Sequence, residues 1–251
     1  PVRTSPIPAV AIPGLPLELT YRFPSGEATT VRWPFRTTTA FRPWAARLAI
    51  RACMEARGLP ETRLARGVLQ VLPTRPESAE AAGLRAVAEQ ALRGLPADPF
   101  AEGALAFLDG RRAEALVHLA RVPEAEPGGW EARVWEGWAL YLDSRFEDAA
   151  ERVEPHIGLD AALVGPLWGR LSIALGLQAS LSDGDVAGWF AQADAMGQRL
   201  ERSGRRVEGA TIRAIAQVEW ARAWTGMGRD PEERLEKALA IIEGVGGWDA
   251  L

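Results

Sequence analysis

Two stretches of the chain carry nearly the same motif 34 residues apart, and this repeat constrains the fold more than any other feature. "FLDGRRAEALVHL" spans residues 107–119, and "YLDSRFEDAAERV" spans residues 141–153. The pairs at this offset are Gly103 and Gly137, Phe107 and Tyr141, Leu108 and Leu142, Asp109 and Asp143, Gly110 and Ser144, Arg111 and Arg145, Glu114 and Asp148, and Ala115 and Ala149. A repeat of this length is typical of supersecondary units that cannot bury an apolar face alone, so neighbouring units must stack.

Each copy predicts two helices joined by a tight turn. A run with helical spacing precedes Gly110 or Ser144, and a second run follows it. Small residues on both helices, such as Gly137 on the first and Ala149 on the second, let two helix backbones approach closely. The segment Asp109-Gly110-Arg111 is therefore interpreted as the turn of a paired-helix scaffold.

These segments resemble the tetratricopeptide repeat, a helix–turn–helix unit of 34 residues. The resemblance depends on a small residue followed twelve places later by alanine, on a large apolar residue four places after that, and on a closing proline: Gly103, Ala115, Leu119 and Pro127 in the first copy, and Gly137, Ala149 and Val153 in the second. The chain departs from the pattern at Glu102 and Glu136, where the family has leucine, and at Pro99 and Arg133, where it has tryptophan. The resemblance covers roughly residues 77–245 and implies a mainly α fold, a TPR-like α-solenoid of stacked helical hairpins.

Two looser helical hairpins follow the repeats. They are expected in residues 163–196, with a turn at Gly184 and Asp185, and in residues 210–242, with a turn from Gly228 to Pro231. Helices at 61–72 and 77–94 are expected to add one more pair.

The N-terminal part of the chain has a different character. Five prolines in residues 1–16 predict an extended arm. Alternating and β-branched residues at 17–23 and 29–35, separated by "PSGEA", predict a small β-hairpin. A helix is expected from Pro43 to about Gly58.

Charge divides the chain into two parts. Residues 1–75 hold eleven arginines and four glutamates, a net charge of +7, whereas the remainder has 18 basic and 29 acidic side chains, a net charge of −11. We therefore expect a basic N-terminal part at 1–75 and a TPR-like array at 76–251. The two parts either have distinct partners or attract each other.

The basic part raises an alternative function. Arginines alternate with aromatic residues there, a pattern typical of nucleic-acid contacts, and the candidates are Arg22, Arg32, Arg36, Arg42 and Arg47. The stretch "TTVRWPFRTTTAF" leading into a helix, followed by repeats, also resembles bacterial transcriptional regulators of the SARP type. That resemblance implies a DNA-contacting N-terminal part and a sensing or assembly array. The opposing interpretation is that these arginines pair with acidic residues of the chain.

Aromatic residues of the repeats are the candidate protein-binding site. Trp135 and Trp138 lie three residues apart on the first helix of the second copy, Tyr141 continues the stripe, and Phe107 is its counterpart in the first copy. In tetratricopeptide-like arrays the first helix of each pair lines a groove that takes peptides or helices, and aromatic anchors there would dominate binding. The same spacing also fits core packing.

Signals for catalysis are poor in this sequence, and an enzyme is the third and weakest hypothesis. It has no Walker loop, no HExxH, no CxxC and no nucleophile elbow. Its one cysteine, Cys53, lies far in sequence from the two histidines, His118 and His156. We expect no enzyme activity, no metal and no cofactor, and hence a non-enzymatic protein-binding scaffold or adaptor.

The expected location is the cytoplasm. Prolines interrupt the N-terminal residues, so no secretory signal is predicted. No apolar run reaches the roughly eighteen residues that a membrane helix needs. Partners on a membrane are therefore not expected, and the oligomeric state stays open.

Overall fold

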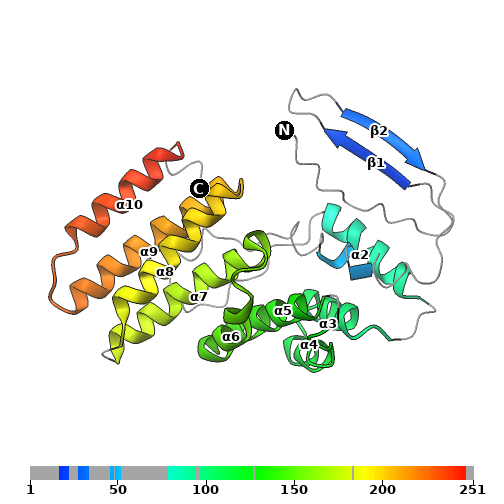
Figure 1. Ribbon diagram of the computed structural model, residues 1–251, viewed down its shortest axis with the longest axis horizontal. Helices are drawn as coiled ribbons and strands as arrows, with labels where there is room; N and C mark the ends of the chain where they lie inside the picture. The colour runs from blue at the N-terminus through cyan, green and yellow to red at the C-terminus, as the bar shows by residue number, and fades with distance from the viewer. Residues whose placement is uncertain are drawn as a thin grey trace. The chain divides into compact units, whose positions relative to one another are not determined.

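The computed structural model describes residues 17–22, 28–33, 46–47, 49–51, 79–93, 97–126, 128–182 and 184–246 (Figure 1). The chain forms two compact units, one of residues 1–58 and 74–114, the other of residues 59–73 and 115–251. This division falls inside helix α4 (Arg112–Leu119). The boundary between residues 75 and 76 that the charge pattern suggests stays a prediction.

The first unit contains two strands and the first helices. Strand β1 (Leu17–Arg22) pairs antiparallel with β2 (Ala28–Trp33), and Leu17 lies opposite Trp33. Residues 46–47 and 49–51 are helical, and α2 (Ala79–Leu92) and α3 (Pro99–Leu108) follow. Helix α3 begins at Pro99 because the carboxylate of Asp98 accepts a hydrogen bond from the Phe100 backbone N–H. The expected arm at 1–16 and the expected helix at 61–72 lie outside the described residues.

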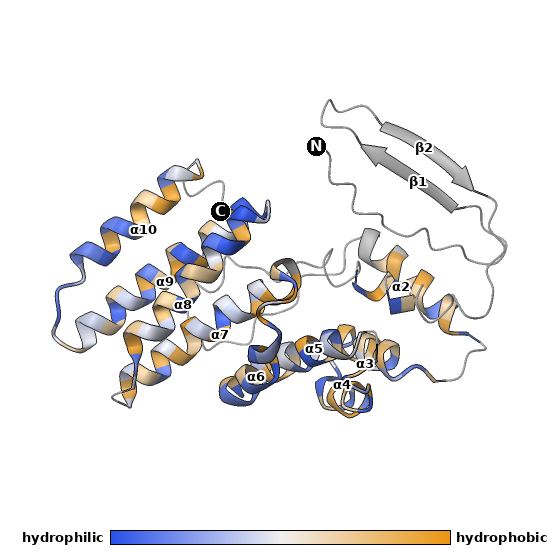
Figure 2. Cartoon of the chain, viewed as in Figure 1, coloured by the Kyte–Doolittle hydropathy of each residue, from blue (hydrophilic) through white to orange (hydrophobic). Residues whose placement is uncertain are grey.

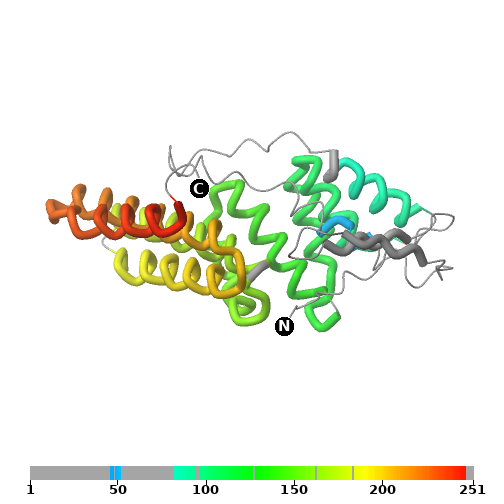
Figure 3. Tube along the Cα trace, turned by 90° about the horizontal axis from the view of Figure 1, so that it is seen from above, coloured from blue at the N-terminus to red at the C-terminus, as the bar shows by residue number. Residues whose placement is uncertain are grey.

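The described part of the second unit consists of helices joined by short turns. Helix α4 (Arg112–Leu119) spans the division between the units, and the elements after it are α5 (Gly129–Leu142), α6 (Phe146–Val153), the 3₁₀ turn η3 (Glu154–His156), α7 (Ala161–Leu181), α8 (Val186–Arg202), α9 (Arg206–Gly226) and α10 (Glu232–Gly244). Helices next to each other in sequence pack side by side, α5 with α6, α7 with α8, α8 with α9 and α9 with α10 (Figures 1 and 3). The prediction of a mainly α chain is confirmed for the described residues.

One turn geometry recurs where helices end. Gly110, Ser144, Gly204 and Gly228 have positive φ angles of 77°, 60°, 94° and 70°. Each is followed by an arginine whose N–H donates to a carbonyl five residues earlier: Arg111 to Ala106, Arg145 to Leu140, Arg205 to Leu200, and Arg229 to Trp224. This is the Schellman closure, which satisfies the last carbonyls of a helix. The repeated motif therefore encodes a helix end.

Paired helices differ in how they are buried. Nine consecutive residues of α5, from Val134 to Leu142, are buried, so every face of that helix is covered. Helix α7 is likewise buried continuously over residues 163–176. The second helices are amphipathic, as in α8, whose buried residues are Val186, Phe190, Ala193, Met196, Gly197 and Leu200. Figure 2 shows the same mixture of hydrophilic and hydrophobic residues along α10.

Glycines set the closest helix approaches. A Cβ on Gly137 of α5 would collide with Val153 of α6 and lie 3.6 Å from the Ala149 carbonyl oxygen, so the predicted close approach at these positions is confirmed. A second approach was not predicted. A Cβ on Gly197 of α8 would lie 2.6 Å from the carbonyl oxygen of Gly209 in α9, and a Cβ on Gly209 would collide with the Gly197 carbonyl. Only glycine allows these backbones to touch.

Candidate functional site

The aromatic residues expected to line a groove lie in the interior instead. Trp135, Trp138 and Tyr141 are 5%, 4% and 6% exposed. The reason is that α5 is covered on every side, so none of its faces is left to form the wall of a groove. Phe107 is half-buried near the end of α3, in the first unit. The burial of these three residues of α5 therefore fits the interpretation that they pack in the core.

Their contacts form a packing layer around a buried arginine. The rings of Trp138 and Tyr141 meet edge to face, with centroids 5.9 Å apart, and Tyr141 lies 5.5 Å from the Phe146 ring. The guanidinium of Arg170, on α7, lies 5.2 Å from the Trp138 ring centre and is 2% exposed as a residue. Burial raises the pKa of Tyr141, and the charge of Arg170 partly opposes that shift. These side chains join α5, α6 and α7.

Arg133 and Glu136 of α5 form a largely buried ion pair. Arg133 Nη1 lies 2.7 Å from Glu136 Oε1, and Arg152 of α6 lies 3.7 Å from the other carboxylate oxygen. Arg133 Nη2 also donates to the carbonyls of Leu119 and Val122, just where α4 ends. Burial raises the pKa of Glu136, and the two arginines partly oppose the shift. The carboxylate of Glu136 is thus paired where it is buried, and Arg133 also ties α5 to the end of α4.

Trp220 and Trp224 of α9 pack against the neighbouring helices α8 and α10. The Arg234 guanidinium, on α10, lies 3.6 Å from the Trp220 ring centre and 4.7 Å from that of Trp224. Trp220 also stacks on Phe190 of α8, with ring centroids 5.7 Å apart. Arg234 further donates to the side-chain oxygen of Gln217 at 3.5 Å. This cluster therefore stabilises the packing of α8, α9 and α10.

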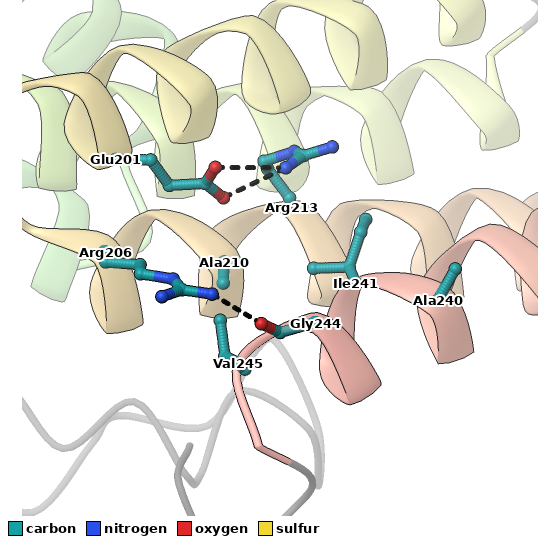
Figure 4. Close-up of a pocket in the computed structure, with 8 residues that line it drawn as sticks. All are labelled: Glu201, Arg206, Ala210, Arg213, Ala240, Ile241, Gly244 and Val245. Carbon is teal, nitrogen blue, oxygen red and sulfur yellow. Dashed lines mark hydrogen bonds and ion pairs between the residues drawn. The ribbon is translucent and has the colours of Figure 1, made fainter.

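A pocket of about 290 Å³ lies among α8, α9 and α10 (Figure 4). Arg213 bonds both carboxylate oxygens of Glu201, at 3.0 and 3.2 Å, and Asp194 at 3.2 Å. Arg206 donates to the Gly244 carbonyl at 2.6 Å, near the end of α10. Burial opposes the charge of Arg213, but its two carboxylate partners leave the pKa above its ordinary value. Arg206 and Arg213 are thus both hydrogen-bonded to groups of the chain itself. The other residues that line the pocket include Ala210, Ala240, Ile241, Gly244 and Val245.

Of the expected nucleic-acid contacts, Arg47 is the one whose side chain the structure describes. Its Nε and Nη2 donate to the two carboxylate oxygens of Asp98 at 3.0 and 3.1 Å, and its guanidinium lies 5.3 Å from the Phe100 ring centre. Arg47 therefore supports the residue that caps α3. Arg22 lies on β1 and Arg32 on β2. Arg36 and Arg42 lie outside the described residues.

The histidines show no metal-binding arrangement in the part of the chain that the structure describes. No group of three His, Cys, Asp or Glu side chains there could hold an ion. His156 is buried in η3, and burial lowers its pKa. Cys53 lies outside the described residues. Among the described helices, none has both the length and the apolar character needed to cross a bilayer.

Exposed apolar side chains mark a different candidate surface. The large ones among the described residues are Val117, Leu159, Leu181, Val207, Val218, Met227, Leu235 and Leu239. Four of these, Val207, Val218, Leu235 and Leu239, lie on α9 and α10. The spacing of Leu235 and Leu239, four residues apart on a helix, was a usable signal in the sequence, but exposure distinguishes them from core leucines only in the fold.

Comparisons of the chain with protein family models, with curated protein sequences and with solved structures give no match. Function must therefore be inferred from the residues and their contacts.

Proposed function

We propose that the chain is a TPR-like α-solenoid with an N-terminal β-hairpin, and that it acts as a non-enzymatic scaffold or adaptor that binds another protein. One observation supports this most directly. Helices α5 and α6, α7 and α8, and α9 and α10 pack as three successive pairs. The turns after α3, α5 and α9 each contain a left-handed residue followed by arginine. Arrays of stacked helix pairs offer extended surfaces for protein partners.

The distribution of polar groups favours binding over catalysis. Arg133 pairs with Glu136 on its own helix and donates to backbone carbonyls at the end of α4, whereas Arg213 and Arg234 join α9 to α8 and to α10. By contrast, four of the eight large exposed apolar side chains among the described residues lie on α9 and α10. Apolar surface that faces water is typical of a site where another protein docks.

The DNA-binding alternative has one observation in its favour, the net charge of +7 in residues 1–75. Against it, Arg47 is engaged by Asp98. A single experiment can separate the two functions, because a protein partner and a duplex depend on different surfaces and respond differently to salt.

The test is site-directed photo-crosslinking of the full chain in cells of its own source. A photoreactive residue replaces one exposed side chain at a time, namely Val117 on α4, Gln192 on α8, Arg222 on α9 and Glu236 on α10. We expect one protein to be captured from some of these positions and, once purified, to bind the full chain saturably in calorimetry.

The same preparation is titrated with duplex DNA at low and high salt. A captured protein that fails to bind after purification, or the capture of none from any position, would overturn the scaffold function. DNA binding that weakens steeply with salt, together with no protein partner, would favour the transcriptional regulator.

A further inference from the structure

In the second unit, both helices of the pair α7 and α8 pack against the first helix of the next pair, α9. On α8, Trp189 contacts Trp168 of α7, and Met196 and Leu200 contact Gly165 of α7. The residues directly after these three contact α9: Phe190 meets Trp220, Gly197 meets Gly209, and Glu201 meets Arg213.

The same offset holds on α7. Trp168 faces α8, and the next residue, Gly169, faces Ile212 of α9. One residue corresponds to a rotation of about 100° around a helix axis. In this pair, then, residues that receive the following pair come directly after positions that join the two helices, and one of them, Phe190, also contacts Gly176 of α7.

Applied to α9 and α10, this offset identifies one surface. The residues of α9 that meet α10 include Arg206, Gln217, Trp220 and Trp224. Val207 follows Arg206 and Val218 follows Gln217, whereas Ala221, which follows Trp220, is buried. On α10, Arg234 meets α9 and Ala238 is buried, and the next residues are Leu235 and Leu239. We call these four residues, Val207, Val218, Leu235 and Leu239, the end face.

The end face is open to solvent. Its side chains are 46%, 37%, 43% and 51% exposed, in the order of the chain. No helix among the described residues covers them, although the equivalent surface of α7 and α8 is covered by α9. The fold itself thus shows which kind of element such a surface receives, namely an α-helix.

Charge around the end face narrows the choice of helix. Glu232, Glu236 and Glu243 are exposed on α10, on the side of Leu235 and Leu239 that faces away from α9. Helix α10 holds four glutamates against Arg234 and Lys237. A helix carrying arginine or lysine along that edge would be attracted, and a second copy of α10 would meet like charge.

We propose that the end face binds one amphipathic α-helix of a partner protein, whose apolar stripe is bordered by basic residues on the side that meets α10. This inference rests on the proposed scaffold function and names the docking surface for it. It is a helix-in-groove mode of recognition, in which apolar anchors give affinity and rim charges give orientation. Leu235 and Leu239 are the expected anchors.

The probe is a fluorescent synthetic peptide of 21 residues, the length of α9, with a leucine and alanine stripe and arginine along one edge. Its twin has glutamate in place of arginine. Anisotropy is measured with the full chain, with L235E/L239E, and with the control L159E/L181E, which changes two leucines that are 61% and 88% exposed off the end face.

We expect the arginine peptide to bind the wild-type chain and the control alike. Binding to L235E/L239E should weaken by about tenfold or more, because the substitutions bury charge against apolar groups. The glutamate twin should bind the wild-type chain more weakly at low salt than the arginine peptide does. Circular dichroism and thermal unfolding verify that both double variants are folded.

Three results would overturn the end face as a helix site: no binding of the arginine peptide to the wild-type chain, equal weakening in both double variants, or unchanged binding by L235E/L239E. Self-association of the wild-type chain in sedimentation equilibrium, abolished by L235E/L239E alone, would overturn the partner helix in favour of a second copy. If the cross-linked partner binds L235E/L239E normally, only the end face fails and the scaffold function stands.

Discussion

Ser144 occupies a backbone conformation that suits glycine. Its φ angle is 60°, in the left-handed region, where Gly110 lies at the matching position one repeat earlier. A side chain in that region costs on the order of 1 kcal/mol. We predict that Ser144→Gly raises the free energy of unfolding by about 0.5 to 1 kcal/mol, measured by chemical denaturation, because the relief of strain exceeds the added entropy of the unfolded chain.

Ser203 supplies the matched control for this prediction. It also lies just after a helix, but its φ angle is −81°, and its hydroxyl donates to the Leu200 carbonyl at 2.7 Å. Ser203→Gly should therefore lower the free energy of unfolding. Equal effects of the two substitutions would show that the left-handed conformation of Ser144 carries no strain.

At the scale of elements, the contact of α8 with α9 depends on two glycines. Gly197 and Gly209 bring the two backbones together, and a Cβ on Gly209 would also lie 2.7 Å from the side chain of Glu201. Gly209→Ala should lower the free energy of unfolding by about 2 kcal/mol or more, because the helices must separate. Urea denaturation followed by circular dichroism measures this change.

Gly226, a second glycine of α9, provides a control in which alanine changes helix propensity without changing packing. A Cβ on Gly226, near the end of the helix, would meet nothing within 4 Å. Gly226→Ala is expected to leave stability unchanged or raise it by less than about 1 kcal/mol. If Gly209→Ala proved as harmless as Gly226→Ala, the close approach of α8 and α9 would not contribute to stability.

At the scale of the whole molecule, two buried carboxylates link stability to pH. Burial raises the pKa of Glu136 and of Glu219 above the ordinary 4.5, against the opposing charges of Arg133 and Arg152 for the first and Arg222 for the second. The native state then binds these protons more tightly than the unfolded chain. The contribution of these groups to stability is therefore present at low pH and is lost as pH rises from 4.5 through the folded pKa values.

The double variant E136Q/E219Q tests this linkage. Chemical denaturation is repeated at a series of pH values from 4.5 upward. The free energy of unfolding should fall less with rising pH in the double variant than in the wild-type chain. The control E147Q/E236Q changes two exposed glutamates on α6 and α10 and should keep the wild-type dependence. An unchanged slope in E136Q/E219Q would contradict the expected pKa shifts.

Local patterns predicted the helix hairpins well because helix ends depend on nearby residues. The turn at Gly110 is closed by hydrogen bonds within a few residues, and so are those at Ser144 and Gly228. The close approach of Gly137 to α6 could likewise be anticipated from small residues at fixed spacing. By contrast, the pairing of Arg47 with Asp98 joins residues 51 apart, and neither residue signals the other in the sequence.

The repeat alone was enough to predict paired helices and their turns, because hydrogen bonds and apolar spacing within about 34 residues specify them. The packing of the helices against one another decided which side chains are buried and which are exposed. Trp135 and Trp138 have the spacing of groove anchors, yet α5 is enclosed by its surroundings and they become core, while Leu235 and Leu239 have the spacing of core residues and remain exposed. Which face of a helix meets water depends on the elements packed around it, and periodicity within one helix carries no information about those neighbours.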